Sequence, residues 1–197
     1  YGATKLASDK LFIAGNSYSG KNETCFSVVR YGNVMGSRGS IIPFFKSIKG
    51  EDALPITHQD MTRFMISLEA GVELVWHAFN DMVGGEIYVK KIPSMRVVDI
   101  AKVIAPEREQ KIIGIRPGEK MHEQMIGFED APYTYEYESH YKILPSIHSW
   151  SLDKKRIGNG KLVSPDFTYT SDNNSEWMSN EDFSLWLEEN KSNIGKI

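Results

Sequence analysis

Tyr1 and Lys5 stand at the start of the chain with the spacing Tyr-x-x-x-Lys. Residues four apart lie on one face of a helix, so the Lys5 ammonium would come close to the Tyr1 phenol. A phenol has an ordinary pKa of about 10, and a nearby positive charge lowers that pKa because it favours the phenolate. The pair could therefore move a proton at a substrate hydroxyl. Taken alone, the spacing more often means a solvated lysine beside a packed tyrosine, so the neighbouring residues must decide.

The elements that would position this pair alternate between helices and short apolar strands. Apolar residues at helical spacing predict a helix over residues 5–14. β-Branched and aromatic residues predict a buried strand over 25–31, which leads into the glycine-rich loop 32–40. Residues 54–57 are too short and too proline-broken for a central strand. Further helices are expected at 41–49, 67–79 and 97–104, and further strands at 86–90 and 111–115.

This alternation indicates an α/β fold with a largely parallel sheet. The last third of the chain is different, because residues 127–170 are rich in Tyr, Pro, Asp and Ser and have weak periodicity. A clear helix returns at 180–190, where Ser179 and Asp182 have the spacing of a capping box.

The composition excludes several classes of protein. The chain has 197 residues, of which 41% are hydrophobic and 25% charged, so a membrane span, a collagen-like repeat and wholesale disorder are not expected. The net charge of −3 gives no reason to bind nucleic acid or an anionic membrane. Cys25 is the single cysteine, which favours the cytoplasm, and the five histidines are too scattered to predict a metal site.

Two motifs together carry a family resemblance. Tyr1-Gly2-Ala3-Thr4-Lys5, followed at the end of a strand by Arg30-Tyr31-Gly32-Asn33-Val34-Met35-Gly36, resembles the extended short-chain dehydrogenase/reductase family of nucleotide-sugar enzymes. Met61-Thr62-Arg63-Phe64 and the segment 114–123 are similar to one branch of it. That branch dehydrates UDP-N-acetylglucosamine at C4 and C6 with inversion at C5, which opens pseudaminic acid synthesis. Segments 164–169 and 173–177 resemble the same branch, so the likeness covers nearly the whole chain.

The resemblance implies the C-terminal part of a Rossmann-like, doubly wound parallel sheet together with a smaller α/β lobe for the substrate. Residues 1–40 would carry the later strands and the catalytic helix of the NADP-binding domain. Residues 41–197 would form mainly the UDP-sugar lobe, with 64–92 returning to the Rossmann sheet.

The front of the chain departs from the family pattern. The sequence contains no G-x-G-x-x-G for a dinucleotide pyrophosphate, and the family's Thr-Asp-Lys acid–base segment lies upstream of the tyrosine. The chain also opens with Tyr1 rather than Met. We therefore expect a fragment whose N-terminal part is missing and which is inactive by itself.

The resemblance assigns a role to each matching residue. Tyr1 would take the proton from the sugar 4-hydroxyl as hydride leaves C4 for NADP, and Lys5 would hold the nicotinamide ribose and lower the Tyr1 pKa. Val34 would lie with its backbone against the nicotinamide. Asn33 would hydrogen-bond the substrate, or as a loop residue it would satisfy its own backbone.

Arg63 and Arg116 are the candidates for the UDP end, because a diphosphate is held best by a planar, bidentate guanidinium. In the sequence Arg-Pro-Gly-Glu-Lys, Glu119 could orient the Arg116 guanidinium or hold a uridine ribose hydroxyl. For Arg63, an ion pair with Asp60 or Glu69 is an equal alternative.

The resemblance thus implies a hydro-lyase that uses NADP, acts on UDP-N-acetylglucosamine and forms a homo-oligomer. One rival is a related nucleotide-sugar epimerase or reductase, which shares the Tyr and Lys. The other is a non-catalytic UDP-sugar-binding module, which would bind no dinucleotide and would expose a sheet edge and an apolar face.

Overall fold

The computed structural model describes residues 2–20, 24–48 and 52–196. The chain packs into two compact units. Unit 1 comprises residues 1–31, 69–91 and 125–168, and unit 2 comprises 32–68, 92–124 and 169–197. These boundaries differ from the expected ones, because residues 125–168 pack with the N-terminal helix in unit 1.

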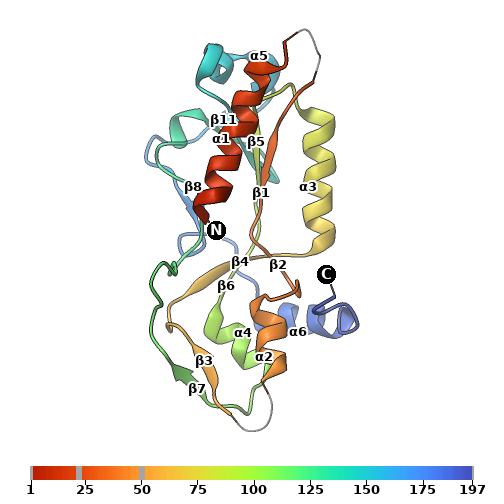
Figure 1. Ribbon diagram of the computed structural model, residues 1–197, viewed down its shortest axis with the longest axis vertical. Helices are drawn as coiled ribbons and strands as arrows, with labels where there is room; N and C mark the ends of the chain where they lie inside the picture. Colours follow the sequence, from red (N-terminus) through yellow and green to blue (C-terminus); the bar gives the residue numbers. More distant parts are fainter. Residues whose placement is uncertain (1, 21–23, 49–51, 197) are drawn as a thin grey trace. The chain divides into compact units, whose positions relative to one another are not determined.

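Unit 1 is built on a five-stranded sheet in the order β1-β5-β10-β9-β11. Strand β1 runs parallel to β5, with Val28 opposite Ile87, and the outer strands are antiparallel. Helices α1 and α3 lie on opposite faces of this sheet (Figure 1). The strands are β1 (Val28–Arg30), β5 (Ile87–Lys90), β9 (Thr134–Glu136), β10 (His140–Ile143) and β11 (Lys161–Leu162). The helices are α1 (Gly2–Tyr18), α3 (Leu68–Asp81), η1 (Ala131–Tyr133), η2 (Ile147–Leu152) and α5 (Lys154–Ile157).

The predicted α/β class is confirmed, and so are the helices at α1 and α3 and the strands β1 and β5. The antiparallel strands β9 and β10 were not expected. They lie within 127–170, where the buried polar residues His140 and Lys142 conceal the alternation that marks a strand. As a result, β5 pairs in parallel with β1 on one side and antiparallel with β10 on the other.

Helix α1 is mostly exposed and is fastened to unit 1 by polar contacts. Asp9 accepts a hydrogen bond from Arg30 Nε at 2.7 Å. Near the end of the helix, the Asn16 amide donates to the Phe26 carbonyl and accepts from the Phe26 N–H, both at 2.9 Å. This amide mimics one rung of a β-ladder, so it fixes the segment that leads into β1.

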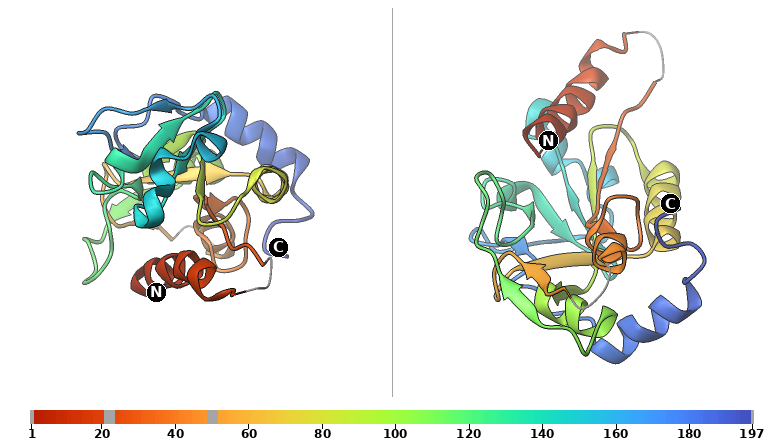
Figure 2. Two further views of the ribbon diagram at one scale, coloured as in Figure 1. Left: turned by 90° about the horizontal axis from the view of Figure 1, so that it is seen from above. Right: turned by 60° about the horizontal axis from the view of Figure 1, so that its bottom comes forward.

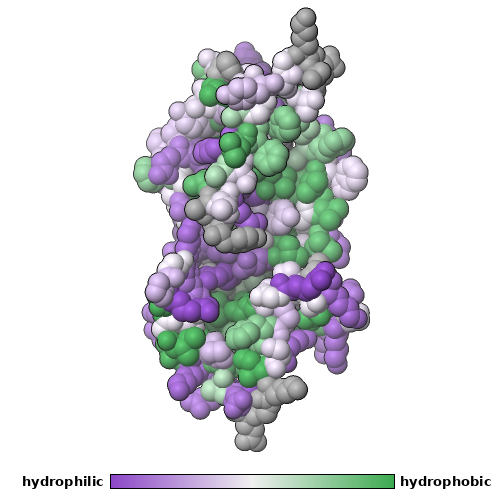
Figure 3. All heavy atoms as spheres, in the orientation of Figure 1, coloured by the Kyte–Doolittle hydropathy of each residue, from purple (hydrophilic) through white to green (hydrophobic). Residues whose placement is uncertain are grey.

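Helix α3 is apolar on two faces. Gly71, Leu74 and Ala78 are buried, and Leu74 and Ala78 pack with Tyr88 of β5. A second stripe at helical spacing is exposed, with Trp76 62% and Phe79 64% accessible. Apolar side chains are visible on this part of the surface in Figure 3. A contiguous exposed stripe of this kind is unusual on a soluble domain. Its members are Leu68, Val72, Val75, Trp76 and Phe79.

Unit 2 is organised around the central strand β4. Strand β4 pairs in parallel with β2, with Asn33 opposite Met65, and antiparallel with β6, with Thr62 opposite Arg96. A separate parallel pair joins β3 and β7, which fits the expectation that residues 54–57 are not a central strand. The strands are β2 (Asn33–Val34), β3 (Leu54–Ile56), β4 (Thr62–Ile66), β6 (Ser94–Arg96), β7 (Gln110–Ile112) and β12 (Tyr169–Thr170), and β8 (Gln124–Ile126) spans the unit boundary.

The helices of unit 2 enclose one hydrophobic core. They are α2 (Ile41–Ser47), α4 (Val97–Ile104) and α6 (Asn180–Glu189), and all three were predicted. Phe183 and Leu187 of α6 pack in the same core as Ile100 of α4, and Figure 2 shows these two helices side by side. Ser179 caps α6 by accepting from the Asp182 N–H at 3.0 Å, as the spacing predicts. Strands β4 and β6 were not expected.

No helix within the described ranges combines the length and the apolar character needed to cross a bilayer. Among the same residues, no group of three or more His, Cys, Asp or Glu side chains is arranged to hold a metal ion.

His140 is a buried histidine, 7% exposed, on the α3 face of the unit 1 sheet. Its ring stacks on Tyr137 with centroids 4.6 Å apart and lies 4.5 Å from His77. Burial, aided by the charges of His77 and Lys142, lowers the pKa of His140 from 6.5 to about 4. The folded protein therefore holds this ring neutral.

We predict that His140 makes the protein acid-sensitive. Because its folded-state pKa lies below its ordinary value, the stability it contributes is complete above pH 6.5 and is lost as the pH falls toward about 4. His140→Phe keeps the stack on Tyr137 and should flatten the fall in free energy of unfolding over this range, by at most about 1.4 kcal/mol per pH unit. Chemical denaturation at several pH values measures the slope.

The matched control is His58→Asn, since His58 is a partly exposed histidine and its side chain is 38% accessible. This variant should retain the slope of the wild type. Equal slopes for wild type and His140→Phe would contradict the prediction.

Candidate functional site

The candidate residues divide between the two units. Tyr1 lies outside the described residues. Lys5 is exposed in the first turns of α1 in unit 1. Asn33, Val34, Arg63, Arg116 and Glu119 all belong to unit 2.

Arg30 ties the helix of Lys5 to the rest of unit 1, in addition to the Asn16 contacts with Phe26. Besides Asp9, which follows Lys5 by one helical turn, it donates through Nη1 to the Met125 carbonyl at 2.8 Å and to Asp130 at 3.1 Å. Its side chain is largely buried. Sequence reasoning noted Arg30 as part of a motif and missed this role. The available signal was an arginine at the end of an apolar, half-buried strand, where a charged side chain needs partners.

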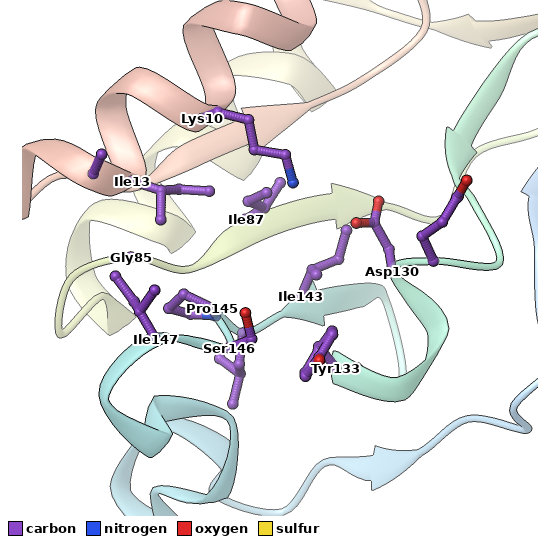
Figure 4. A pocket seen from close by; sticks show the side chains of 13 residues that line it. Lys10, Ile13, Gly85, Ile87, Asp130, Tyr133, Ile143, Pro145, Ser146 and Ile147 are labelled. Atoms are coloured by element: carbon purple, nitrogen blue, oxygen red, sulfur yellow. The ribbon is translucent and has the colours of Figure 1, made fainter.

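Unit 1 also contains a cavity of about 320 Å³ between α1 and the sheet. In Figure 4, Lys10 and Ile13 of α1 face Ile87 and Ile143 across it. Its walls are mainly apolar, and Lys5 is not among its described lining residues. We therefore assign this cavity no part in the chemistry of the candidate residues.

Asn33 and Val34 are held in place by β4. Asn33 is exposed and Val34 is half-buried on β2, and the ladder continues as Met35 N–H donates to the Ile66 carbonyl at 2.9 Å. Gly32 makes this approach possible, because a Cβ at that position would lie 2.4 Å from the Phe64 Cβ. A glycine is thus needed at the point where the loop meets β4.

The C-terminal segment of the chain contacts the turn that follows Val34. Gly36 has a φ of +77°, which favours glycine, and its carbonyl accepts from the Gly195 N–H at 2.7 Å. Trp186 and Ile194 lie against the same residue. The C-terminal segment therefore buttresses the loop that carries Asn33 and Val34.

Arg116 and Glu119 lie in one turn. The Glu119 N–H donates to the Arg116 carbonyl at 3.0 Å, and Gly118 takes a φ of +80°. Arg116 Nε and Nη2 donate to the two oxygens of Glu119, each at 3.2 Å. The hydrogen bond from Arg116 lowers the pKa of Glu119, and the same contact raises the pKa of Arg116.

Glu119 also accepts from Thr57 Oγ1 at 3.3 Å. Its side chain is 18% exposed, whereas that of Arg116 is 74% exposed. Both carboxylate oxygens of Glu119 are therefore engaged with protein groups. Of the two roles expected for Glu119, this geometry favours orienting the guanidinium over holding a ribose hydroxyl.

Arg63 lies on β4 with its guanidinium against the main chain that follows this turn. Within the described ranges, neither Asp60 nor Glu69 pairs with it. Its partners are the carbonyls of Thr62 at 2.7 Å, Met121 at 3.1 Å and Lys120 at 3.2 Å, and Met61 Sδ at 3.2 Å. Unit 2 thus brings Arg63 to the main chain that directly follows the Arg116–Glu119 turn, and β4, which carries Arg63, pairs with the strand of Asn33.

Several known proteins are similar in sequence to this chain. Residues 1–145 match the family described as polysaccharide biosynthesis protein. A UDP-N-acetylglucosamine 4,6-dehydratase (inverting) of Campylobacter jejuni is 52% identical over 189 residues, covering 92% of this chain and 57% of that protein. A UDP-glucose 4-epimerase of Rickettsia canadensis is 36% identical over 177 residues, covering 87% of this chain and 52% of that protein.

Among solved structures, that of Pen from Bacillus thuringiensis aligns with 97% of this chain and 58% of its own, with a TM-score of 0.82 and 31% identity. The chain spans little more than half the length of these relatives. Its fold is Rossmann-like α/β, as the resemblance implied.

We predict that Gly32→Ala separates β2 from β4. The added methyl group must displace Phe64, so the free energy of unfolding should fall by about 1–3 kcal/mol, and amide exchange at Met35 should accelerate because its N–H bonds Ile66. Gly71→Ala in α3 is the control, because open space surrounds that position and alanine favours a helix. Equal stability of the two variants would argue against the prediction.

Proposed function

The chain belongs to the polysaccharide biosynthesis protein family, and on this basis we propose that it is part of an NADP-dependent UDP-N-acetylglucosamine 4,6-dehydratase. The reaction would invert C5 and give a UDP-2-acetamido-2,6-dideoxy-hexos-4-ulose, the first step of pseudaminic acid biosynthesis. One observation carries the proposal. An exposed guanidinium, Arg116, is oriented by Glu119 in a chain 52% identical to a protein named as this dehydratase.

The UDP end would be bound in unit 2. A diphosphate needs donors that are charged and planar, and Arg116 offers such a fork already fixed by two bonds to Glu119. Arg63 would serve the same end from β4 through its positive charge, because its Nη1 and Nη2 already donate to main-chain carbonyls of residues 62, 120 and 121. Asn33, exposed on β2, would hydrogen-bond the sugar.

The residues present suit one end of a nicotinamide dinucleotide. Lys5 presents an exposed ammonium of the kind that binds ribose hydroxyls, and Val34 is a half-buried apolar residue suited to lie beside a planar ring. The 197 residues contain no G-x-G-x-x-G for the pyrophosphate. When bound, the nicotinamide would accept hydride from C4 and return it to C6, so it would end unchanged.

The chain's own part in the chemistry is proton transfer and orientation. Tyr1 would take the proton of the 4-hydroxyl, and the positive charge of Lys5 would make its phenol a stronger acid. A ketone at C4 acidifies the C5 proton, and loss of that proton with the 6-hydroxyl gives net dehydration. Neither group for that elimination is assigned within these residues.

Proton NMR of UDP-N-acetylglucosamine in deuterated water tests the proposal on the protein translated from the complete gene. We expect a new 6-methyl signal, deuterium at C5 and ring couplings that report the inverted centre. The isolated 197-residue chain should give none of these.

A sugar that keeps its 6-hydroxyl group would overturn the dehydratase proposal. If that sugar is epimerised, the related epimerase becomes the better assignment, which the 36% identity to a UDP-glucose 4-epimerase would then explain. A sugar that is bound and unchanged would favour a non-catalytic binding module.

We further predict that Lys5→Met lowers kcat by about 10²-fold or more in the protein translated from the complete gene, because the phenol would lose the charge that lowers its pKa. The proton-transfer limb of the pH–rate profile should also move to higher pH. Lys10→Met on the same helix is the control and should retain activity. Comparable losses in the two variants would show that the charge of Lys5 has no special role.

A further inference from the structure

Glu123 follows the Arg116–Glu119 turn, and its carboxylate is bound to the main chain of β4. Its Oε2 accepts the Phe64 N–H at 2.8 Å. Because Phe64 is fully buried, this bond joins a half-buried carboxylate to the core of unit 2. Burial raises the pKa of Glu123, while the Phe64 N–H and the charges of Arg63 and Lys120 oppose that shift. Burying part of a carboxylate is costly unless it is hydrogen-bonded or paired, and here the Phe64 N–H and the charges of Arg63 and Lys120 offset that cost.

The main chain beside Glu123 is held from a second direction. The Glu123 N–H donates to Ser171 Oγ at 2.9 Å, and the Ser171 N–H donates to the Glu123 carbonyl at 2.8 Å. Ser171 Oγ lies 2.7 Å from Thr62 Oγ1, which lies 2.8 Å from His122 Nδ1. The Thr62 N–H also donates to the Met121 carbonyl at 3.2 Å. Residues 121–123 are therefore fixed to both β4 and the segment at Ser171.

The stretch before this anchor is exposed. Residues 113–118 are all accessible to solvent, and Arg116 lies among them. The other end of the stretch is fixed where the Ile113 N–H donates to the Ile56 carbonyl at 2.8 Å, in continuation of the β3–β7 pair. The direction of Arg116 is thus set by two anchored ends, with Glu119 joined to Thr57 between them.

We propose that Glu123 is a positioning residue, which fixes the downstream end of the Arg116–Glu119 turn to β4 and so presents the Arg116 guanidinium to a nucleoside diphosphate. The role rests on the proposed function of Arg116. Affinity for a diphosphate depends on how little the guanidinium must be ordered on binding. An anchor that removes this ordering cost acts on the binding of UDP without touching it.

The test uses the protein translated from the complete gene, with UDP as the probe in titration calorimetry. Glu123→Ala removes the acceptor for Phe64 N–H, and we expect the Kd for UDP to rise about tenfold or more. Glu123→Asp keeps the charge and withdraws the carboxylate from Phe64, so it should weaken binding similarly. Glu123→Gln keeps an acceptor at the same reach and should restore most of the affinity.

A double-mutant cycle with Arg116→Ala shows whether Glu123 acts through that residue. We expect Glu123→Ala/Arg116→Ala to bind UDP no more weakly than Arg116→Ala alone. Amide hydrogen exchange without ligand should accelerate across residues 116–123 in Glu123→Ala and stay near the wild-type rate in Glu123→Gln. A role confined to global stability would lower the melting temperature without this pattern.

Wild-type affinity in Glu123→Ala and Glu123→Asp, or losses that add in the double mutant, would overturn the positioning role and leave the dehydratase proposal intact. If the wild type binds UDP with the expected pattern of variants and leaves UDP-N-acetylglucosamine unchanged, the positioning role stands and the dehydratase proposal fails. A wild type that does not bind UDP would overturn both.

Discussion

The main-chain hydrogen bonds of β4 support all the candidate residues of unit 2. One edge of the strand pairs with β2 and so sets the position of Asn33 and Val34, while the other pairs with β6. Its first residues bind the segment that follows the Arg116–Glu119 turn, through the Thr62 N–H and the Phe64 N–H. Because β4 is buried from Phe64 to Ile66, these bonds are shielded from water, and any displacement would leave polar groups unpaired. A single rigid strand therefore relates two loops that are distant in sequence.

Sequence reasoning found the helices and missed this strand, for a physical reason. Helix α3 is predicted by apolar residues at helical spacing, and helix α6 is predicted by its Ser179 cap. Strand β4 carries Phe64, Met65 and Ile66 in succession, so both of its faces are buried and no alternation marks it. The Arg116–Glu119 contact could be predicted because its turn is local. The anchoring of Glu123 could not, since it depends on a main-chain N–H in β4, and a main-chain partner leaves no trace in the side-chain pattern.

Unit 1 shows the same limit in another form. Strand β10 buries Lys142, whose ammonium donates to Asp81 at 2.5 Å and to the Arg156 carbonyl at 3.0 Å. A buried lysine is stable only with such partners, and they come from segments far apart in the chain. Sequence patterns count Lys142 as a surface residue, so the strand was expected to be irregular. The same buried polar residue that stabilises this sheet through its contacts therefore also breaks the apolar pattern from which a strand is predicted. Arg30 is a second example, because its largely buried guanidinium is paired with Asp9 of the helix that carries Lys5 and with Asp130.

The ion pair between Arg116 and Glu119 is not expected to stabilise the fold appreciably. An ion pair as exposed as this one contributes little to folding, because water screens it and two side chains must be ordered. Its geometry has a clearer meaning for recognition. Two donors of the guanidinium are taken by one carboxylate, and that carboxylate is held by Thr57, so the plane of the fork is set before any ligand arrives. Glu119 also reduces the local positive charge, which weakens the attraction of Arg116 for an anion. Such a pair suits a ligand whose binding depends more on the orientation of the guanidinium than on its charge. The recognition of a diphosphate by a planar fork, which we propose for Arg116, would be such a case.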